Sequence, residues 1–341
     1  ARVACEILIT GTTVVVAGEI RSPHEITPHL DEIVRGAIEA IGYDAATGFD
    51  LDAAEILDRR QVQSDDIALG VDTGGAGDQG MMFGHAARQT DSLMPLPIML
   101  AHGLVSRQAE VRTSGEFEGL RPDAKSQVTV AYDGRDPVAV TSVLVSTQHD
   151  DGWNSEDPEF KAMVADRIIR PVLGDRWWND DMLILVNPTG RFVTGGPQGD
   201  TGVTGRKIIV DTYGGWGRHG GGAFSGKDPT KVDRSASYMA RHIAKNVVAA
   251  GLADEIEIRL SYAIGQPEPT AVSFDTFGTA TTDDDEIAAF VGGYPLRPLE
   301  IIDYLDLRRP IYVPTSYHGH FGRTPGAGGT FSWETIRTPG A

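Results

Sequence analysis

Cysteine is almost missing from this sequence, which has 341 residues and a single cysteine, Cys5. An intrachain disulfide is therefore excluded, and the composition predicts a reducing, cytoplasmic compartment. Basic residues are also scarce, since 30 Lys and Arg stand against 48 Asp and Glu and the formal net charge is -18. Because nucleic acids attract basic surfaces, we expect no nucleic acid partner. No apolar run approaches the ~20 residues of a membrane span, so we expect no membrane partner.

Glycine is abundant, and it gathers in one basic stretch, residues 211–234, which holds seven glycines. Glycines let backbone N–H groups approach a ligand closely, and Lys and Arg add fixed positive charge. Carboxylates among these cations suggest a divalent metal that neutralises the same anion. The stretch therefore predicts a site for a polyphosphate and its metal. Its cations and their neighbouring carboxylates are Arg218, Lys227, Asp228, Lys231, Asp233 and Arg234.

Two common nucleotide-binding patterns match inside this stretch, but neither has the context it needs. Residues 221–227 read G-x-x-x-x-G-K, but Asp228 follows where a P-loop needs Ser or Thr, and Pro229 disfavours an immediate helix. Residues 215–220 read G-x-G-x-x-G, but no helix opens there and no acidic residue ends a following strand. We therefore expect neither a P-loop nor a dinucleotide fold, and a surface loop without function remains the plain alternative.

Strand-like and helix-like periods alternate along the chain. They predict an α/β (α+β) fold of three similar subdomains, each a mixed sheet plus helices, in a pseudo-threefold arrangement. The first third predicts strands 3–10, 13–20 and 53–59 and helix 28–42. The middle third predicts helix 98–112, strands 127–132 and 138–146, helix 157–173 and strand 182–186. The last third predicts a short strand 208–210, helix 233–250, a half-buried strand 255–264, strand 270–277, helices 283–292 and 299–307, and strand 310–313.

These periods predict three subdomains: an N-terminal one at 1–66, a central one at 74–193 and a C-terminal one at 195–334. The polar Gly/Asp-rich segment 61–77 between the first two is a linker or an active-site lid. Residues 323–329 form another Gly/Pro-rich loop. The first third lacks the opening helix that the other two possess, so we expect the N-terminal subdomain to be truncated at its start.

Four further segments carry candidate ligand-binding residues. Asp78 sits in a glycine turn, where it could face a ligand ammonium or could merely form the turn. Two residues, Asp123 and Lys125, directly precede an expected strand, where an ordinary surface loop is the default interpretation. Phe192 could belong to the core or stack on a base. Another candidate, Lys207, stands directly before the expected strand 208–210, which would fix its position.

Together these segments resemble the S-adenosylmethionine synthase, or methionine adenosyltransferase, family of the bacterial type. The resemblance runs from residue 1 to about residue 334. It implies an enzyme in which the methionine sulfur attacks C5′ of ATP, and in which the released triphosphate is hydrolysed to phosphate and diphosphate. The segments that carry the resemblance are 75–80, 121–127, 146–149, 187–192, 202–213, 220–235 and 317–323.

The resemblance also implies a role for individual residues. Catalysis and triphosphate binding would fall to Lys125, Arg206, Lys207 and Lys227. The rest of the ATP site would comprise Asp78, Asp123, Ser146, Asp200 and Phe192, with Phe192 stacked on adenine. The methionine pocket and its surroundings would comprise Glu19, Gln63, Asp78, Lys231 and Ile264. Asp233 would bind one of two Mg²⁺ ions per site, and Glu6 and Ser225 would bind K⁺.

The resemblance further implies a homodimer with active sites at the interface, often paired into a tetramer. Three features depart from the family pattern, and one of them is the extra Gly/Pro-rich loop after Arg323. The lid segment is shorter than expected, and the family's N-terminal His-Pro-Asp-Lys motif is missing, since His24 and His29 neighbour prolines in another order. A non-catalytic regulatory subunit with the same fold therefore remains an alternative, and a generic P-loop kinase or ATPase is a third.

The missing motif leads to an expectation about the native chain. We expect roughly 35 to 40 further N-terminal residues, with the motif about 25 to 30 residues upstream, within the span that one helix and its loops need. Without them the chain should be nearly inactive, because a metal carboxylate and a histidine would be lost. Intact mass spectrometry tests this, since the mass of the printed sequence together with full synthase activity would contradict it.

Overall fold

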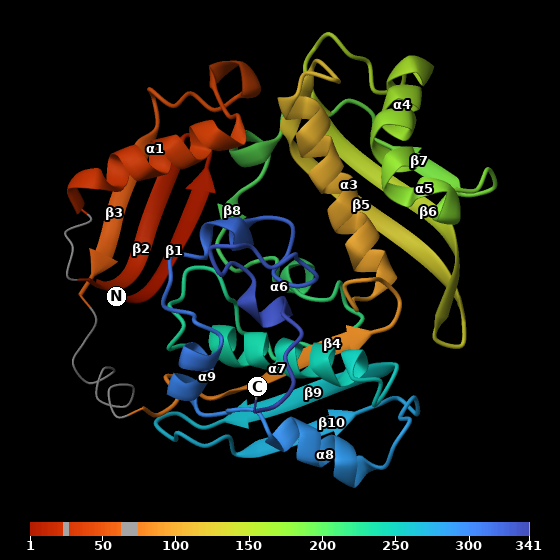
Figure 1. The fold of residues 1–341 in the computed structure, drawn as a ribbon. Coiled ribbons are helices and arrows are strands. Elements are labelled where there is room, and N and C mark those ends of the chain that lie inside the picture. Colours follow the sequence, from red (N-terminus) through yellow and green to blue (C-terminus); the bar gives the residue numbers. More distant parts are fainter. Residues whose placement is uncertain (23–26, 63–73, 341) are drawn as a thin grey trace.

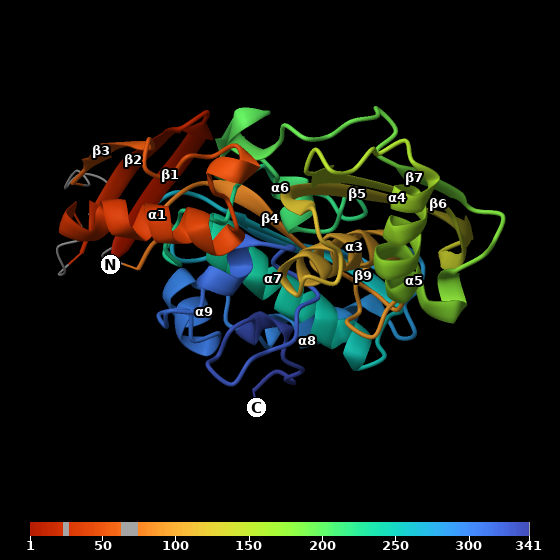
Figure 2. The same cartoon turned by 90° about the horizontal axis from the view of Figure 1, so that it is seen from above.

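The structure is a computed structural model that describes residues 1–22, 27–62 and 74–340. Three sheets, each accompanied by helices, form three lobes (Figure 1). This arrangement confirms the predicted mixed α/β class. Viewed from above, the helices of the N-terminal and central lobes lie on the same side of their sheets (Figure 2). Within the described part of the chain, no helix combines the length and the apolar character needed to cross a bilayer.

The N-terminal sheet has the strand order β3-β2-β1-β8. Strands β1 and β2 form an antiparallel hairpin, and β3 returns parallel to β2 after helix α1. Strand β8 arrives from far along the chain and pairs with β1. Helix α1 buries Val34 and Ile38, four residues apart, because this spacing places both on one helical face. The bounds are β1 (Arg2–Thr10), β2 (Thr13–Arg21), α1 (Leu30–Ile41), β3 (Glu55–Gln61) and β8 (Gly202–Val203).

The central sheet has the order β5-β6-β7, with an antiparallel β5/β6 pair and a parallel β6/β7 pair. Strand β5 begins earlier than predicted, so Asp123 and Lys125 lie inside the strand and the loop interpretation is wrong. The predicted single helix 157–173 is interrupted by a π-helical turn. The bounds are α3 (Leu96–Thr113), β5 (Leu120–Asp133), β6 (Asp136–His149), α4 (Pro158–Val164), the turn Ala165–Ile169, α5 (Arg170–Trp177) and β7 (Leu183–Val186).

The C-terminal sheet has the order β10-β9-β4 and packs on helix α7, which is buried along most of its length. Strand β4 comes from the middle of the chain and was not predicted. At Gly84 a Cβ atom would lie 1.9 Å from the carbonyl carbon of Ala240, so only glycine lets β4 lie this close to the helix backbone. The bounds are β4 (Gly80–Ala87), α7 (Val232–Ala249), β9 (Glu255–Tyr262), β10 (Ala271–Asp275), α8 (Asp284–Gly292) and α9 (Pro298–Tyr304).

Two predicted strands are wrong. Residues 208–211 form a single helical turn, α6 (Ile208–Asp211), in which the Asp211 N–H donates to the Lys207 carbonyl oxygen at 2.9 Å. Three apolar residues are too few for periodicity to distinguish a strand from a helical turn. The region of 310–313 leads into a 3-10 turn, Val313–Ser316. Pro310 and Pro314 lack the N–H groups that a sheet ladder needs.

The predicted half-buried strand 255–264 is instead almost entirely buried as β9, and this includes two carboxylates. Glu255 accepts hydrogen bonds from Arg135 and from the Trp216 indole, and Glu257 forms an ion pair with Arg218. Burial would raise the pKa of Glu255, but hydrogen bonds from His85, Arg135 and Trp216 lower it to about 2. Acidic residues on β9 therefore mark ion pairs inside the fold and not a solvent-facing side of the strand.

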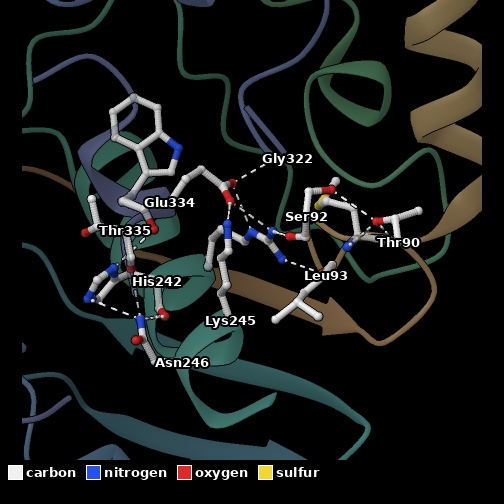
Figure 3. A network of polar contacts seen from close by, with 12 residues as sticks. Thr90, Ser92, Leu93, His242, Lys245, Asn246, Gly322, Glu334 and Thr335 are labelled. Carbon is white, nitrogen blue, oxygen red and sulfur yellow. Dashed lines mark hydrogen bonds and ion pairs between the residues drawn. The ribbon is translucent and has the colours of Figure 1, made fainter. Parts of the chain in front are cut away.

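A buried ion pair fastens the C-terminal segment to helix α7 (Figure 3). The Arg241 guanidinium donates to both carboxylate oxygens of Glu334 at 3.0 Å, and Lys245 donates to the same carboxylate at 2.8 Å. Arg241 also donates to the carbonyl oxygens of His85, Ser92 and Leu93 at 2.7 to 2.9 Å. One side chain thus joins α7, the end of β4 and the C-terminal segment.

We expect Glu334→Gln to lower the free energy of unfolding by about 3–5 kcal/mol, because it leaves two buried cations without a counter-charge. Burial would raise the pKa of Glu334, but Arg241 and Lys245 hold it below its ordinary value. The stability from this pair is therefore present above the unfolded carboxyl pKa and is lost as the pH falls through the lowered folded value. Urea unfolding at pH 7 and at acidic pH measures both effects.

The matched control is Asp254→Asn, which neutralises the carboxylate of the exposed Arg88–Asp254 pair. We expect a change of at most about 1 kcal/mol there, since water screens exposed pairs. Equal losses in the two variants would contradict the structural role of Glu334.

Candidate functional site

The glycine-rich stretch folds back along strand β1. The Cys5 N–H donates to the Gly226 carbonyl oxygen at 2.8 Å, and the Asp228 N–H donates to the Val3 carbonyl oxygen at 2.9 Å. A Cβ atom at Gly226 would lie 2.2 Å from the Cys5 carbonyl oxygen, so this approach requires glycine. The loop that carries Lys227 is therefore fixed to the N-terminal sheet.

A cavity of about 260 Å³ lies where this loop meets strands β1 and β2. Four predicted site residues line it together: Glu6, Glu19, Ser225 and Lys227. Thr204, two residues before Arg206, also lines it. The structure thus brings the predicted potassium ligands, one predicted methionine residue and one predicted triphosphate cation to a single cavity.

Ion pairs order the charged residues of the loop. Lys227 donates to Asp233 at 2.9 Å, and Lys231 donates to Asp228 at 2.8 Å. Burial would raise the pKa of Asp228, but hydrogen bonds from Lys231, from Thr230 and from the backbone of β1 hold it below its ordinary value. Asp228 therefore stays ionised and fixes Lys231, a function that the sequence pattern did not reveal.

Asp233 lies in the first turn of α7 and is not the N-cap. The helix begins at Val232 with Lys231 as its cap residue, and no side chain caps it. The Asp233 carboxylate faces the positive end of the helix dipole. Together with Met81 and Met82 of β4 it lines a small hollow, which places the Asp78 turn, just before β4, in the same region.

Arg206 and Lys207 are exposed at the edge of this region. In the described part of the chain, neither side chain forms a hydrogen bond or an ion pair. Lys207 is the N-cap residue of α6, so a helical turn fixes its backbone where a strand was expected. Two cations without a protein counter-charge beside a glycine-rich loop are suited to hold a polyphosphate.

A second cluster of predicted site residues lies on the central sheet. Lys125 is exposed and stands opposite Ser146 in the β5/β6 register. The Asp123 carboxylate accepts a hydrogen bond from the Gly196 N–H at 2.9 Å. Phe192 is half-buried, and it belongs to none of the three hydrophobic clusters of the described residues. The stacking of Phe192 on adenine stays a prediction.

The remaining predicted residues occupy turns around these clusters. Asp200 is exposed, and its N–H donates to the Gly196 carbonyl oxygen at 3.0 Å. Asp78 is half-buried and accepts from the Gln79 N–H at 2.8 Å. Ile264 is 61% exposed, next to a Gly265 N–H that donates to the Ala76 carbonyl oxygen. Gln63 lies outside the described residues.

No hydrogen bond or ion pair of the described residues joins the side chains of Lys125 and Phe192 to those of Lys227 and Asp233. The predicted site residues lie on two parts of the fold. One group lies at the glycine-rich loop and β1, and the other lies on the central sheet.

The described residues contain no group of three or more His, Cys, Asp or Glu side chains that could hold a metal ion. The predicted site still fits Mg²⁺, because Mg²⁺ is commonly bound by only one or two carboxylates together with substrate phosphates. Asp233 would supply such a carboxylate. For K⁺, the two predicted oxygen-bearing residues Glu6 and Ser225 line the same cavity.

Three family models cover nearly the whole chain. They are described as S-adenosylmethionine synthetase N-terminal, central and C-terminal domains, and they match residues 1–65, 73–192 and 194–335. Proteins named S-adenosylmethionine synthase from Lacticaseibacillus casei and from Lacticaseibacillus paracasei are each 53% identical over 339 residues. Each match covers 95% of this chain and 85% of the relative.

Proposed function

The chain belongs to the S-adenosylmethionine synthetase family, and we propose a mechanism for this reaction from the site described above. The enzyme is a methionine adenosyltransferase that makes S-adenosylmethionine from ATP and L-methionine. A bond forms between the methionine sulfur and C5′ of the ribose, while the bond from C5′ to the triphosphate oxygen breaks. Water then cleaves the released triphosphate into phosphate and diphosphate.

The observation that carries this mechanism is the set of cations around the glycine-rich loop. The leaving triphosphate bears about four negative charges, which preorganised cations stabilise best in a site with little water. Lys227 is held beside β1, and Arg206 and Lys207 are free of counter-charges among the described residues. We assign these three residues and Lys125 to the triphosphate.

The sulfur nucleophile needs no general base, so orientation of the two substrates supplies much of the remaining rate. Glu19, Gln63, Asp78, Lys231 and Ile264 would form the methionine pocket and its surroundings. Phe192 would stack on adenine, and Asp123, Ser146 and Asp200 would complete the nucleotide site. A carboxylate such as Asp78 suits the methionine ammonium, because hydrogen bonds between charged groups are the stronger ones.

The family's need for a divalent cation and potassium leads us to propose two Mg²⁺ ions per site and K⁺. Asp233 would hold one Mg²⁺, and Glu6 and Ser225 would hold K⁺. Bound Mg²⁺ supplies charge neutralisation on the phosphate oxygens. The Lys227–Asp233 ion pair fits this proposal, since a phosphate–metal unit presents matching charges to both side chains.

We also propose a homodimer, paired into a tetramer, with active sites at the subunit interface. The two separate groups of site residues support it, because a second copy could bring one group to the other. Each of the three sheets also exposes large apolar side chains, such as Leu8 at 36%, Met81 at 47% and Leu183 at 57%. The cytoplasmic location remains a prediction from the cysteine content.

Product analysis of the purified native protein, with any N-terminal residues that precede the printed sequence, tests the function with ATP, methionine, Mg²⁺ and K⁺. We expect S-adenosylmethionine, phosphate and diphosphate. ADP as the nucleotide product would favour a phosphoryl-transfer enzyme. A folded protein without any product would favour the non-catalytic regulatory subunit.

We expect Lys207→Met to lower turnover by at least ~100-fold, the effect of removing one preorganised charge partner from a developing anion. Steady-state kinetics with ATP as the varied substrate measures the loss. Lys161→Met on helix α4 is the matched control, because Lys161 is an exposed lysine outside the site. Near-normal turnover of the Lys207 variant would show that Lys207 does not stabilise the leaving triphosphate.

We expect Asp233→Asn to raise the Mg²⁺ concentration needed for half-maximal activity at least ~10-fold, since the amide is a much poorer magnesium ligand. A Mg²⁺ titration of the initial rate checks this, with Asp284→Asn as control for a carboxylate in the first turn of a helix. An unchanged Mg²⁺ requirement together with lower thermal stability would show that Asp233 serves only the helix.

We expect two inactive variants, Lys125→Met and Lys227→Met, to complement each other when co-expressed with different tags. If each site takes one lysine from each subunit, random pairing in a two-fold dimer leaves about a quarter of all sites intact, which is about half of the sites in the doubly tagged dimers. Activity of the doubly tagged species measures this. No recovery in a purified mixed dimer would place both lysines in one subunit's site.

A further inference from the structure

A chain of buried polar groups links helix α6 to helix α7 through the C-terminal segment. The His320 N–H donates to the Asp211 carbonyl oxygen at 2.9 Å, so His320 is fixed against the last residue of α6. The His320 ring is fully buried, and its Nδ1 atom lies 2.8 Å from the Tyr238 hydroxyl on α7. Lys207 is the N-cap residue of α6, so this series of hydrogen-bonded groups starts next to a residue that is predicted to bind triphosphate.

The same chain continues to the other triphosphate segment. Arg234 Nε lies 3.1 Å from the Tyr238 hydroxyl oxygen, and Arg234 Nη1 lies 2.7 Å from the Lys227 carbonyl oxygen. Arg234 is buried and its Nη2 also donates to Thr315. Each group between α6 and Lys227 therefore contacts the next one, and Tyr238 and His320 lie at the centre of this series.

Hydrogen-bond chemistry fixes the proton positions along this chain. A guanidinium can only donate, so Arg234 donates to the Tyr238 oxygen, and the Tyr238 hydroxyl hydrogen is left to donate to His320 Nδ1. Burial, aided by Arg234, Arg323 and His102, lowers the pKa of His320 well below its ordinary value. In the tautomer whose Nδ1 accepts from Tyr238, the neutral ring carries its only proton on Nε2.

The Nε2–H group of His320 faces a carboxylate that it does not reach. His320 Nε2 lies 4.0 Å from Asp211 Oδ1 and has no hydrogen-bond partner among the described residues. Burial raises the pKa of Asp211 to about 6 against the opposing effect of Arg234, so its charge at neutral pH is poorly solvated. A buried donor and a poorly solvated acceptor thus stand slightly too far apart, which is an unusual arrangement in a packed interior.

We propose that His320 is a positioning residue whose Nε2–H closes onto Asp211 when Arg206 and Lys207 bind a polyphosphate. A movement of α6 by about 1 Å would bring the two atoms to hydrogen-bond distance. With this hydrogen bond formed, the segments that carry Lys207 and Lys227 would be held in a fixed position relative to each other. The inference rests on the proposed triphosphate role of these lysines.

The alternative is that His320 and Tyr238 only stabilise the core. Tyr238 stacks on Trp333 with ring centroids 3.7 Å apart, and a phenylalanine would keep that contact. Tyr294 offers a matched control, because its hydroxyl donates to the Arg337 carbonyl oxygen at 2.8 Å in the same lobe. A structural role predicts similar behaviour of Tyr238→Phe and Tyr294→Phe.

The test measures binding of inorganic tripolyphosphate with Mg²⁺ by calorimetry, together with KM for ATP, kcat and thermal stability. We expect Tyr238→Phe and Tyr294→Phe to lose similar thermal stability. Only Tyr238→Phe should weaken tripolyphosphate binding and raise KM for ATP, by roughly 10-fold, as for one lost hydrogen bond to a charged network.

Asp211→Asn gives a second, independent readout. At pH 8 we expect this variant to melt at a higher temperature than the wild type, because a poorly solvated charge is removed. The titratable groups around that carboxylate are the charged Arg234, which opposes the shift, and the uncharged His320 and Tyr238. Tripolyphosphate should nevertheless bind more weakly, and the double variant with Tyr238→Phe should bind no more weakly than the weaker single variant.

Wild-type tripolyphosphate affinity in Tyr238→Phe, or strictly additive losses in the double variant, would overturn the positioning role of His320. The proposed function fails differently, namely if the wild-type protein binds tripolyphosphate but forms no S-adenosylmethionine. The two failures are therefore distinguishable in the same set of proteins.

Discussion

The buried ion pair between Arg241 and Glu334 is the constraint on which the rest of the C-terminal lobe depends. Both side chains are fully buried, and Arg241 also donates to the carbonyl oxygens of His85 in β4 and of Ser92. Because a buried cation must be paired, the C-terminal segment cannot leave α7 without a large loss of stability. Helix α7 is thereby held rigid between its sheet and the C-terminal segment.

The rigidity of α7 determines where the chemistry can occur. Its first turn carries Asp233, and Arg234 holds the Lys227 carbonyl oxygen from inside the lobe. The glycine-rich loop in front of the helix is bound on its other side to β1. The loop thus bridges the N-terminal and C-terminal lobes, which explains why a site for a highly charged ligand forms at their junction.

The sequence was most informative where a long periodic pattern or a long motif was present. The limits of helices α3 and α7 lie within two residues of the prediction, and the apolar face of α7 spans several turns. The glycine-rich loop was predicted as a site, and its residues do gather around one cavity with Glu6 and Glu19. Short segments were unreliable, as α6 shows, because one helical turn has no period to detect.

Other features depend on partners distant in the sequence and could not be predicted from a local pattern. Strand β4 pairs with β9 across about 170 residues of chain, and glycine at 84 is explained only by the helix behind it. Asp228 was one of the carboxylates that suggested a metal, but it accepts hydrogen bonds from Lys231 and from the Val3 N–H of β1. The most direct test of the account is a structure with a non-hydrolysable ATP analogue, methionine and Mg²⁺. The account predicts phosphate oxygens on Lys227 and Lys207 and a metal on Asp233, and an unchanged Lys227–Asp233 pair with the phosphates bound elsewhere would contradict it.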